Sequence, residues 1–275
     1  MNRLRMRFIG KNSFTVQKHK RVIEKAVGPE VAYRLEQMRM HPDTWERPND
    51  MMQNIVENYL PPPPGYTATQ YVTDWLVGLI FASVHTTSEN GTVVLYRVMQ
   101  HPEVIPEILE EVDRVMAGKD HVMDGEDIKS MAKLDSLCRE TMRLKNIYLS
   151  LPHRNVGSAP ITLSNGSIVQ PGHDVIINYW NNHSLNRMTG TLDNSFKPFR
   201  FVDQDKQASK VGNDFLPFGL GKHACPGRWF ALQEIKTLVA QLLQEYDFEA
   251  VDEPYFPNGE GNVIPFGQVK VSRKL

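Results

Sequence analysis

The chain has 275 residues, with 31 Lys and Arg against 32 Asp and Glu, so its formal net charge is −1. This length is enough for one large hydrophobic core or two small ones, and 41% hydrophobic with 23% charged residues is typical of a soluble globular chain. The near-zero charge argues against nucleic acid or an anionic membrane surface as the main partner, and two cysteines, Cys138 and Cys225, are too few for a disulfide scaffold.

The first 25 residues are strongly basic, with eight Lys or Arg residues and one acid, Glu24, which gives this segment a charge of +7. Such a start is compatible with a transit peptide or a basic arm, but we favour the solvated face of an ordinary helix. The longest apolar run, Trp75 to Val84, has ten residues. A membrane-spanning helix needs about 20, so the sequence predicts no transmembrane segment.

The spacing of apolar residues and the positions of Gly and Pro predict a mainly helical chain with a minor β component in its second half. The first helix is expected to break near Gly28 and Pro29, and the proline run Pro61–Gly65 is a stiff extended connector. The helix after this connector is expected to be about 45 Å long, because each residue adds about 1.5 Å. The predicted helices cover residues 18–40, 50–59, 69–99, 105–116, 126–145 and 227–246.

β structure is expected before the last helix. Ile161–Val169 contains the turn Asn165-Gly166, which is typical of a hairpin. Pro171-Gly172 predicts another turn ahead of the apolar run Val175–Ile177, and residues 181–226 are expected to be mostly loop.

The segment Phe215–Arg228 is expected to carry the chemistry. Gly219 and Gly221 allow the backbone to turn sharply close to a bulky flat group, and Pro226 suits the first turn of the last helix. Cys225 would then lie at a helix N-terminus, where the dipole favours a thiolate. The sequence has no second Cys or His pair at zinc spacing nearby. A single thiolate in a bent loop fits a metal whose other ligands come from a cofactor, which describes haem iron with an axial Cys.

The pattern Phe218-Gly219-x-Gly221-x-His223-x-Cys225-Pro226-Gly227 resembles the haem-binding signature of the cytochrome P450 monooxygenases. The resemblance implies the C-terminal part of the cytochrome P450 fold: a long central oxygen-binding helix, a Glu-x-x-Arg helix, and a Cys-ligand loop followed by a helix. It covers about residues 20–250. Residues 1–275 are therefore expected to form a single partial domain that lacks the N-terminal anchor and early helices of the family.

Two further segments resemble elements of the family in the same order. Glu140-x-x-Arg143 is similar to its Glu-x-x-Arg pair, although an acid and an Arg three residues apart are also common on helix surfaces. Pro198-Phe-Arg200-Phe201 is similar to its Pro-x-Arg-Phe element. The resemblance implies that Glu140, Arg143 and Arg200 form a buried structural triad that holds the loop presenting Cys225.

The resemblance also implies haem b as the cofactor and Cys225 as the iron ligand. Arg154 and His223 are expected to pair with the haem propionates, with a plain surface residue and a polar loop residue as the respective alternatives. Cys138 is expected to have a packing role only. The residues expected to bind the cofactor are Arg154, Phe218, Gly219, His223, Cys225 and Gly227.

Ala82-Ser83-Val84-His85-Thr86 resembles the oxygen-binding stretch of the family. Thr86 and His85 are implied to be catalytic, by steering protons toward iron-bound oxygen. Ser83 replaces the usual Gly and His85 the usual acid, and a His with a pKa of about 6.5 can shuttle protons. The alternative for His85 is an ordinary hydrogen-bonded helix residue. The form Ala-x-x-His-Thr-Thr is similar to the fungal microsomal branch that oxidises terpenoid and other secondary-metabolite scaffolds.

The implied function is a monooxygenase that inserts one oxygen atom of O2 into an apolar organic substrate, with electrons from NADPH through a cytochrome P450 reductase-type partner. The family location is the cytosolic face of the endoplasmic reticulum membrane; for this chain alone a cytoplasmic location is expected. The alternatives are a non-catalytic haem-binding remnant, a haem-thiolate isomerase or dehydratase, and a helical interaction module without a cofactor. Parts of 146–153 and 252–265 hint at an apolar ligand without identifying it.

Overall fold

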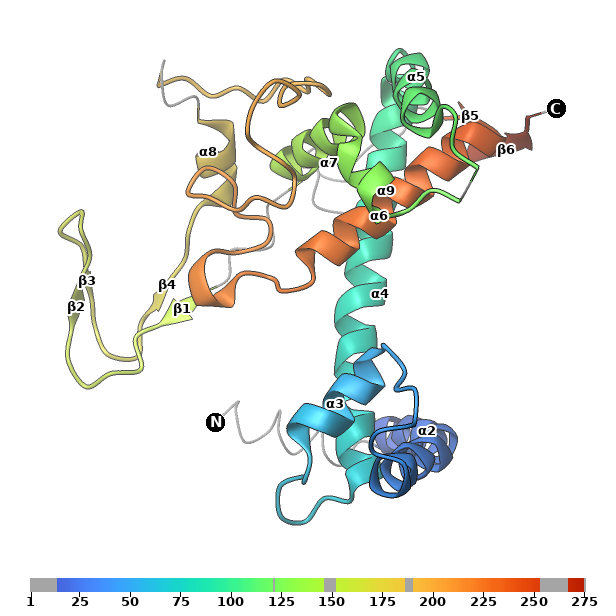
Figure 1. Cartoon of the computed structure of the whole chain (residues 1–275). Helices are drawn as coiled ribbons and strands as arrows, with labels where there is room; N and C mark the ends of the chain where they lie inside the picture. The colour runs from blue at the N-terminus through green and yellow to red at the C-terminus, as the bar shows by residue number, and fades with distance from the viewer. Residues whose placement is uncertain (1–13, 121, 146–151, 186–189, 253–266, 275) are drawn as a thin grey trace. The chain divides into compact units, whose positions relative to one another are not determined.

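The computed structural model describes residues 14–120, 122–145, 152–185, 190–252 and 267–274 (Figure 1). Of the eight basic residues in the first 25, Arg3, Arg5, Arg7 and Lys11 lie outside these ranges. The chain divides into two compact units, Met1–Val84 and His85–Leu275. The division falls within the long helix α4 (Ala68–Gln100), which confirms the predicted helix over 69–99.

The first unit is helical and has its own small core. Helix α2 (Phe14–Met40) packs against α3 (Met51–Tyr59), and Val31, Ile55 and Val72 are buried between the helices of this unit. Asp50 caps α3 by accepting from the Gln53 N–H at 2.8 Å.

Helix α2 is continuous, so the break predicted at Gly28 and Pro29 is wrong. Pro29 cannot donate a backbone hydrogen bond, but the burial of Val31 anchors the following turn. A Cβ on Gly28 would lie 3.4 Å from the methyl group of Thr69. The glycine therefore allows close packing of α2 against the start of α4 instead of ending the helix.

The core of the second unit lies between the second half of α4 and three further helices (Figure 1). These are α5 (Val104–Met116), α7 (Ala132–Leu144) and α9 (Arg228–Glu245), and each of the three contacts the other two. The predictions of helices over 105–116 and 227–246 are confirmed. Fully buried members of this core include Val94, Ile108, Val112, Leu134, Leu137, Ile235 and Val239.

The helix predicted over 126–145 is in fact two helices, α6 (Gly125–Ser130) and α7, with Met131 between them. Glu111 of α5 is 2% exposed, and its carboxylate accepts from the backbone N–H groups of Lys133 and Leu134 at 2.8 and 2.9 Å. A side chain from another helix thus supplies the cap for α7. This long-range contact explains why the helical pattern around Met131 did not reveal the division.

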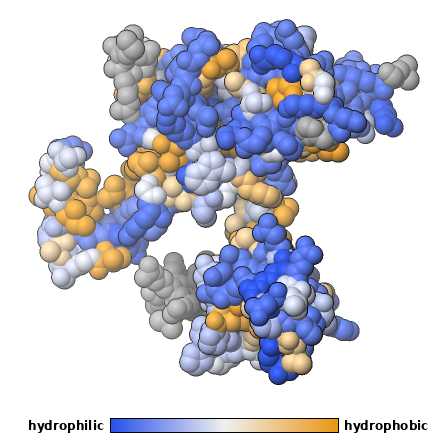
Figure 2. Space-filling model, viewed as in Figure 1, coloured by the Kyte–Doolittle hydropathy of each residue, from blue (hydrophilic) through white to orange (hydrophobic). Residues whose placement is uncertain are grey.

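The β component is small, as predicted. Strand β1 (His153–Arg154) pairs with β4 (Asp174–Val175), and β2 (Ile161–Thr162) pairs with β3 (Ile168–Val169) in the expected hairpin. Gly166 has the positive φ of +83° that this turn needs. Figure 2 shows hydrophobic residues at the surface of this hairpin, where Ile161 and Ile168 are exposed.

The remaining elements are short. The short helix α8 (Tyr179–Ser184) and the 3-10 turn η1 (Gly221–His223) interrupt the predicted loop. Strand β5 (Tyr246–Ala250) pairs antiparallel with β6 (Val269–Arg273), and this pair was not predicted. In the ranges that the structure describes, we found no helix long and apolar enough to cross a membrane.

Candidate functional site

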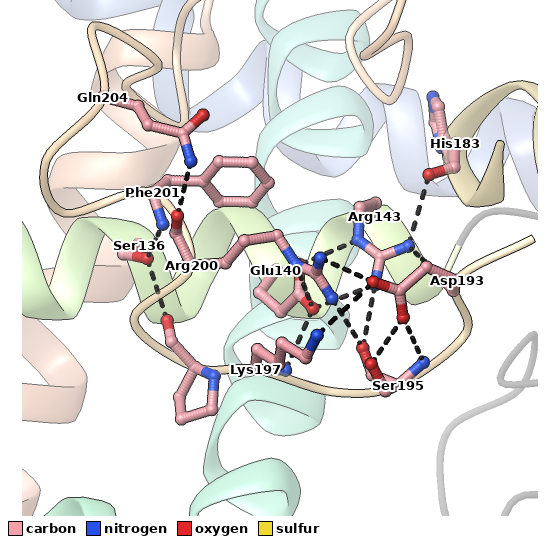
Figure 3. A network of polar contacts seen from close by, with 11 residues as sticks. Ser136, Glu140, Arg143, His183, Asp193, Ser195, Lys197, Arg200, Phe201 and Gln204 are labelled. Atoms are coloured by element: carbon pink, nitrogen blue, oxygen red, sulfur yellow. Dashed lines mark hydrogen bonds and ion pairs between the residues drawn. The ribbon is translucent and has the colours of Figure 1, made fainter. Parts of the chain in front are cut away.

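A buried carboxylate on α7 lies at the centre of a polar network (Figure 3). Glu140 is fully buried and accepts two hydrogen bonds from Arg143, at 2.7 Å to Oε2 and 2.9 Å to Oε1. Arg200 Nε donates to the same Oε1 at 3.0 Å. Two guanidinium groups therefore share one carboxylate, which confirms the predicted triad.

The triad holds the segment that follows α8. Arg143 donates to the backbone carbonyls of His183, Asp193 and Ser195 at 3.2, 2.8 and 3.0 Å. Arg200 donates to the Asp193 carboxylate at 2.8 Å and holds the pKa of that carboxyl well below its usual range, with help from Ser195. The triad thus binds the backbone of His183, Asp193 and Ser195 directly. His183 in turn contacts the Cys225 loop, because its Nε2 accepts from the Leu216 N–H at 2.8 Å.

The Cys225 loop is shaped by backbone hydrogen bonds. The Cys225 N–H donates to the Phe218 carbonyl at 2.7 Å, and the Gly219 N–H donates to the Leu216 carbonyl at 2.9 Å. Gly219 has a φ of +72°, and a Cβ there would lie 3.3 Å from the His223 carbonyl oxygen. A side chain at Gly219 would therefore meet both a strained backbone and a crowded site.

The residues after Cys225 lead into α9. Gly227 is the N-cap of that helix, and Arg228 Nη1 donates to the Cys225 carbonyl at 2.7 Å while its Nε donates to the Ser209 carbonyl at 3.0 Å. Gly227 has a φ of −86°, which any residue adopts, so its backbone does not itself require glycine. Arg228 thus fixes the backbone where the Cys225 loop joins α9.

The two cysteines differ in their surroundings. Cys225 is partly exposed, whereas Cys138 is buried in the core and burial raises the pKa of its thiol to about 12. Cys138 therefore stays a neutral thiol near neutral pH and cannot act as a thiolate ligand. A partly exposed thiol in a glycine-bent loop fits the chemistry of an axial haem ligand.

Strand β1 lies beside the Cys225 loop. The rings of His153 and His223 meet edge to face with centroids 6.3 Å apart. The neighbouring Arg154 uses Nε and Nη2 to bind both oxygens of Asp174 at 2.8 Å, and this pair raises the pKa of Arg154. A guanidinium has five N–H donors, so this ion pair leaves Arg154 with further donors for an anion.

The expected oxygen-binding stretch lies in α4. His85 is 71% exposed, and its Nε2 lies 3.8 Å from Glu89 Oε2. Glu89 in turn binds the buried Lys145 at 2.9 Å, and burial lowers the pKa of Lys145. Thr86 is exposed, and its carbonyl accepts from the Asn90 side chain at 2.8 Å. A carboxylate therefore lies one helical turn from the His that replaces the usual acid.

Sequence reasoning gave no role to three side chains that support the site or the helix α7 that carries Glu140. His183, Glu111 and Arg228 each contact a backbone group far from their own position or at the end of a loop. Of the three, only Arg228 could have been identified from the sequence, because it directly follows the motif Cys225-Pro226-Gly227. The segments that hinted at an apolar ligand fall mostly on 146–151 and 253–266, outside the described residues.

Comparison with known proteins points to a single family. The cytochrome P450 family model matches residues 5–271. Cytochrome P450 monooxygenase 71 of Postia placenta is 34% identical over 184 residues, which cover 63% of this chain and 36% of that protein. Cytochrome P450 monooxygenase ptmU of Penicillium ochrochloron is 30% identical over 210 residues, which cover 72% and 40%. Cytochrome P450 CYP82J17 of Trigonella foenum-graecum is 30% identical over 203 residues, which cover 73% and 38%. The chain spans less than half the length of these relatives.

Proposed function

The chain belongs to the cytochrome P450 family, and from this premise we propose that it acts as a haem-dependent monooxygenase on an apolar organic substrate. The observation that carries the proposal is the Cys225 loop. Its thiol is partly exposed, its N–H is bound to the Phe218 carbonyl at 2.7 Å, and Gly219 and Gly221 bend the backbone with positive φ. When bound, the haem iron supplies the activation of dioxygen.

The residues of this chain would hold the haem in three ways. Cys225 would supply the thiolate ligand, and Phe218, Gly219 and Gly227 would contact the cofactor. Arg154 and His223 would bind the propionates, which is supported by the proximity of β1 to the loop. Arg154 would share its donors between a propionate and Asp174.

Thr86 and His85 would hold and pass protons toward the oxygen-binding side. The position of Glu89, 3.8 Å from His85, supports this role because a carboxylate stabilises the protonated imidazole through which a proton would pass. The hydroxyl of Thr86 is the group from which a proton would be delivered.

Electrons would come from NADPH through a cytochrome P450 reductase-type partner. The substrate class is an apolar small molecule such as a terpenoid or another secondary metabolite, in line with the fungal relatives named as monooxygenases. The cytosolic face of the endoplasmic reticulum membrane is the proposed location of the protein.

The absorption spectrum of the reduced, haem-supplied chain with carbon monoxide tests the proposal. Wild type should show the strongly red-shifted Soret band of thiolate-bound haem, and Cys225→Ala should lose it. Cys138→Ala is the matched control, since it removes the buried cysteine of the pair, and it should keep the band. Failure of wild type to bind haem stoichiometrically, or persistence of the band in Cys225→Ala, would refute the proposal.

Substrate-dependent NADPH consumption with the reductase present separates the candidate activities. A monooxygenase consumes NADPH and O2 together with substrate. An isomerase or dehydratase converts its substrate without consuming NADPH, and a haem-binding remnant shows the spectrum without turnover. His85→Asp, which restores the usual acid, should leave the Soret band in place while changing the NADPH consumption rate.

A further inference from the structure

His183 is a buried imidazole that no part of the proposed chemistry uses. It lies in α8 and is 5% exposed. Its backbone carbonyl accepts from Arg143 Nη1 at 3.2 Å, and its ring Nε2 accepts from the Leu216 N–H at 2.8 Å. The same residue therefore contacts the triad through its main chain and the Cys225 loop through its side chain.

The ring of His183 is held in place by aromatic neighbours. Its centroid lies 5.8 Å from that of Tyr179 and 5.8 Å from that of Phe215, with interplanar angles of 32° and 31°. The guanidinium of Arg139 lies 3.8 Å from the centroid of Phe215. Phe215 and Leu216 are consecutive, so His183 packs against the ring of Phe215 and accepts a hydrogen bond from the N–H of Leu216.

A short series of hydrogen bonds leads from His183 to Cys225. The Leu216 N–H is bound by His183, and the Leu216 carbonyl accepts from the Gly219 N–H at 2.9 Å. That bond closes the turn containing Phe218, whose carbonyl accepts from the Cys225 N–H at 2.7 Å. Both polar backbone groups of Leu216 are thus fixed, one by His183 and one by the loop itself.

We propose that His183 is a positioning residue that couples the Glu140 triad to the Cys225 loop and sets the loop geometry in which Cys225 binds haem iron. The proposal rests on the proposed haem function. His183 does not touch the reacting atoms, and it acts through the backbone of Leu216.

The hydrogen bond fixes the protonation state of the ring. A backbone N–H can only donate, so Nε2 must be unprotonated and the neutral ring carries its proton on Nδ1. Burial, with the charges of Arg143 and Arg139 on α7 opposed by Asp214, lowers the pKa of His183 to about 4. The acceptor is therefore present at neutral pH and is lost on acidification.

Two substitutions separate the hydrogen bond from the packing. His183→Phe keeps a ring between Tyr179 and Phe215 and removes the acceptor. His183→Gln brings an amide oxygen to about the reach of Nε2 and cannot titrate. His41→Phe, at an exposed position of the first unit, is the matched control.

The readouts are the exchange rate of the Leu216 amide in the haem-free chain, the haem dissociation constant, and the Soret position of the reduced carbon monoxide complex. Loss of one buried hydrogen bond should speed the amide exchange and weaken haem binding about tenfold each in His183→Phe. Part of its Soret band should move from the thiolate position to shorter wavelength. His183→Gln should restore all three, and wild type should lose more of the thiolate band than His183→Gln as the pH falls through about 4, the pKa of His183.

Equal values in wild type and His183→Phe would overturn the inference. So would equal losses in the Phe and Gln variants, because the ring would then act by packing alone. If wild type binds no haem, it is the proposed function that fails, and the amide exchange of Leu216 still decides whether His183 holds the loop.

Discussion

Replacing Glu140 by Gln removes the charge that Arg143 and Arg200 share and leaves the volume of the side chain nearly unchanged. Arg143 is 7% exposed, so its charge would stay buried without a carboxylate. Arg200 is 21% exposed and keeps its ion pair with Asp193 at 2.8 Å, so it contributes little to the loss of stability. Removing one partner of a buried ion pair costs about 3–5 kcal/mol, and we expect a loss of that size.

The assay is urea unfolding of wild type and variant, followed by far-UV circular dichroism and extrapolated to zero denaturant. Glu36→Gln is the matched control, since Glu36 and Arg39 have the same three-residue spacing but are 54% and 69% exposed. That change should cost less than about 0.5 kcal/mol. A loss below about 1 kcal/mol for Glu140→Gln would show that the triad is not a buried charge network.

Three further predictions concern the caps, the loop and the pH dependence. Gly219→Ala should lower the thermal unfolding midpoint more than Gly118→Ala does. Both glycines have a φ of +72°, but only a Cβ at Gly219 meets a neighbouring atom, the His223 carbonyl oxygen at 3.3 Å. Equal effects would mean that this contact is relieved at no cost. Glu111→Ala should cost about 1–3 kcal/mol in urea unfolding, since two N–H groups at the start of α7 lose their acceptor; an unchanged midpoint would contradict the capping role. The folded chain keeps His183 neutral down to a pKa of about 4, whereas an unfolded His takes up a proton below about 6.5. The contribution of neutral His183 to the free energy of unfolding is fully present above pH 6.5. Relative to His183→Gln, the free energy of unfolding of wild type should fall by up to about 3 kcal/mol toward pH 4. If the two proteins lose stability in parallel, the pKa of His183 is not lowered by folding.

Short-range patterns in the sequence predicted the elements and the chemistry of the loop. The predicted helix over 50–59 is found as α3, and Asn165-Gly166 predicted the hairpin turn. Gly219, Gly221 and Cys225 lie within seven residues, and their backbone preferences act locally. A local pattern of this kind is visible without knowing the rest of the fold.

Contacts between distant parts of the chain decided what the sequence could not. The division between α6 and α7 depends on the carboxylate of Glu111, which is more than 20 residues away from the groups that it caps. The continuity of α2 through Pro29 depends on packing around Val31 and on the space that Gly28 leaves for Thr69. In both cases tertiary contacts outweigh local propensity.

Motifs of fixed spacing were enough to identify the family, the cysteine that is the candidate ligand, and the three residues of the triad. Only the tertiary structure showed that Glu140 is fully buried between Arg143 and Arg200, and that His183 joins this network to Leu216 in the Cys225 loop. A lone histidine in a loop-rich segment carries no signal of its own. Its role depends on which backbone N–H lies within 3 Å of its ring, and that is set by the folding of residues 33 positions apart.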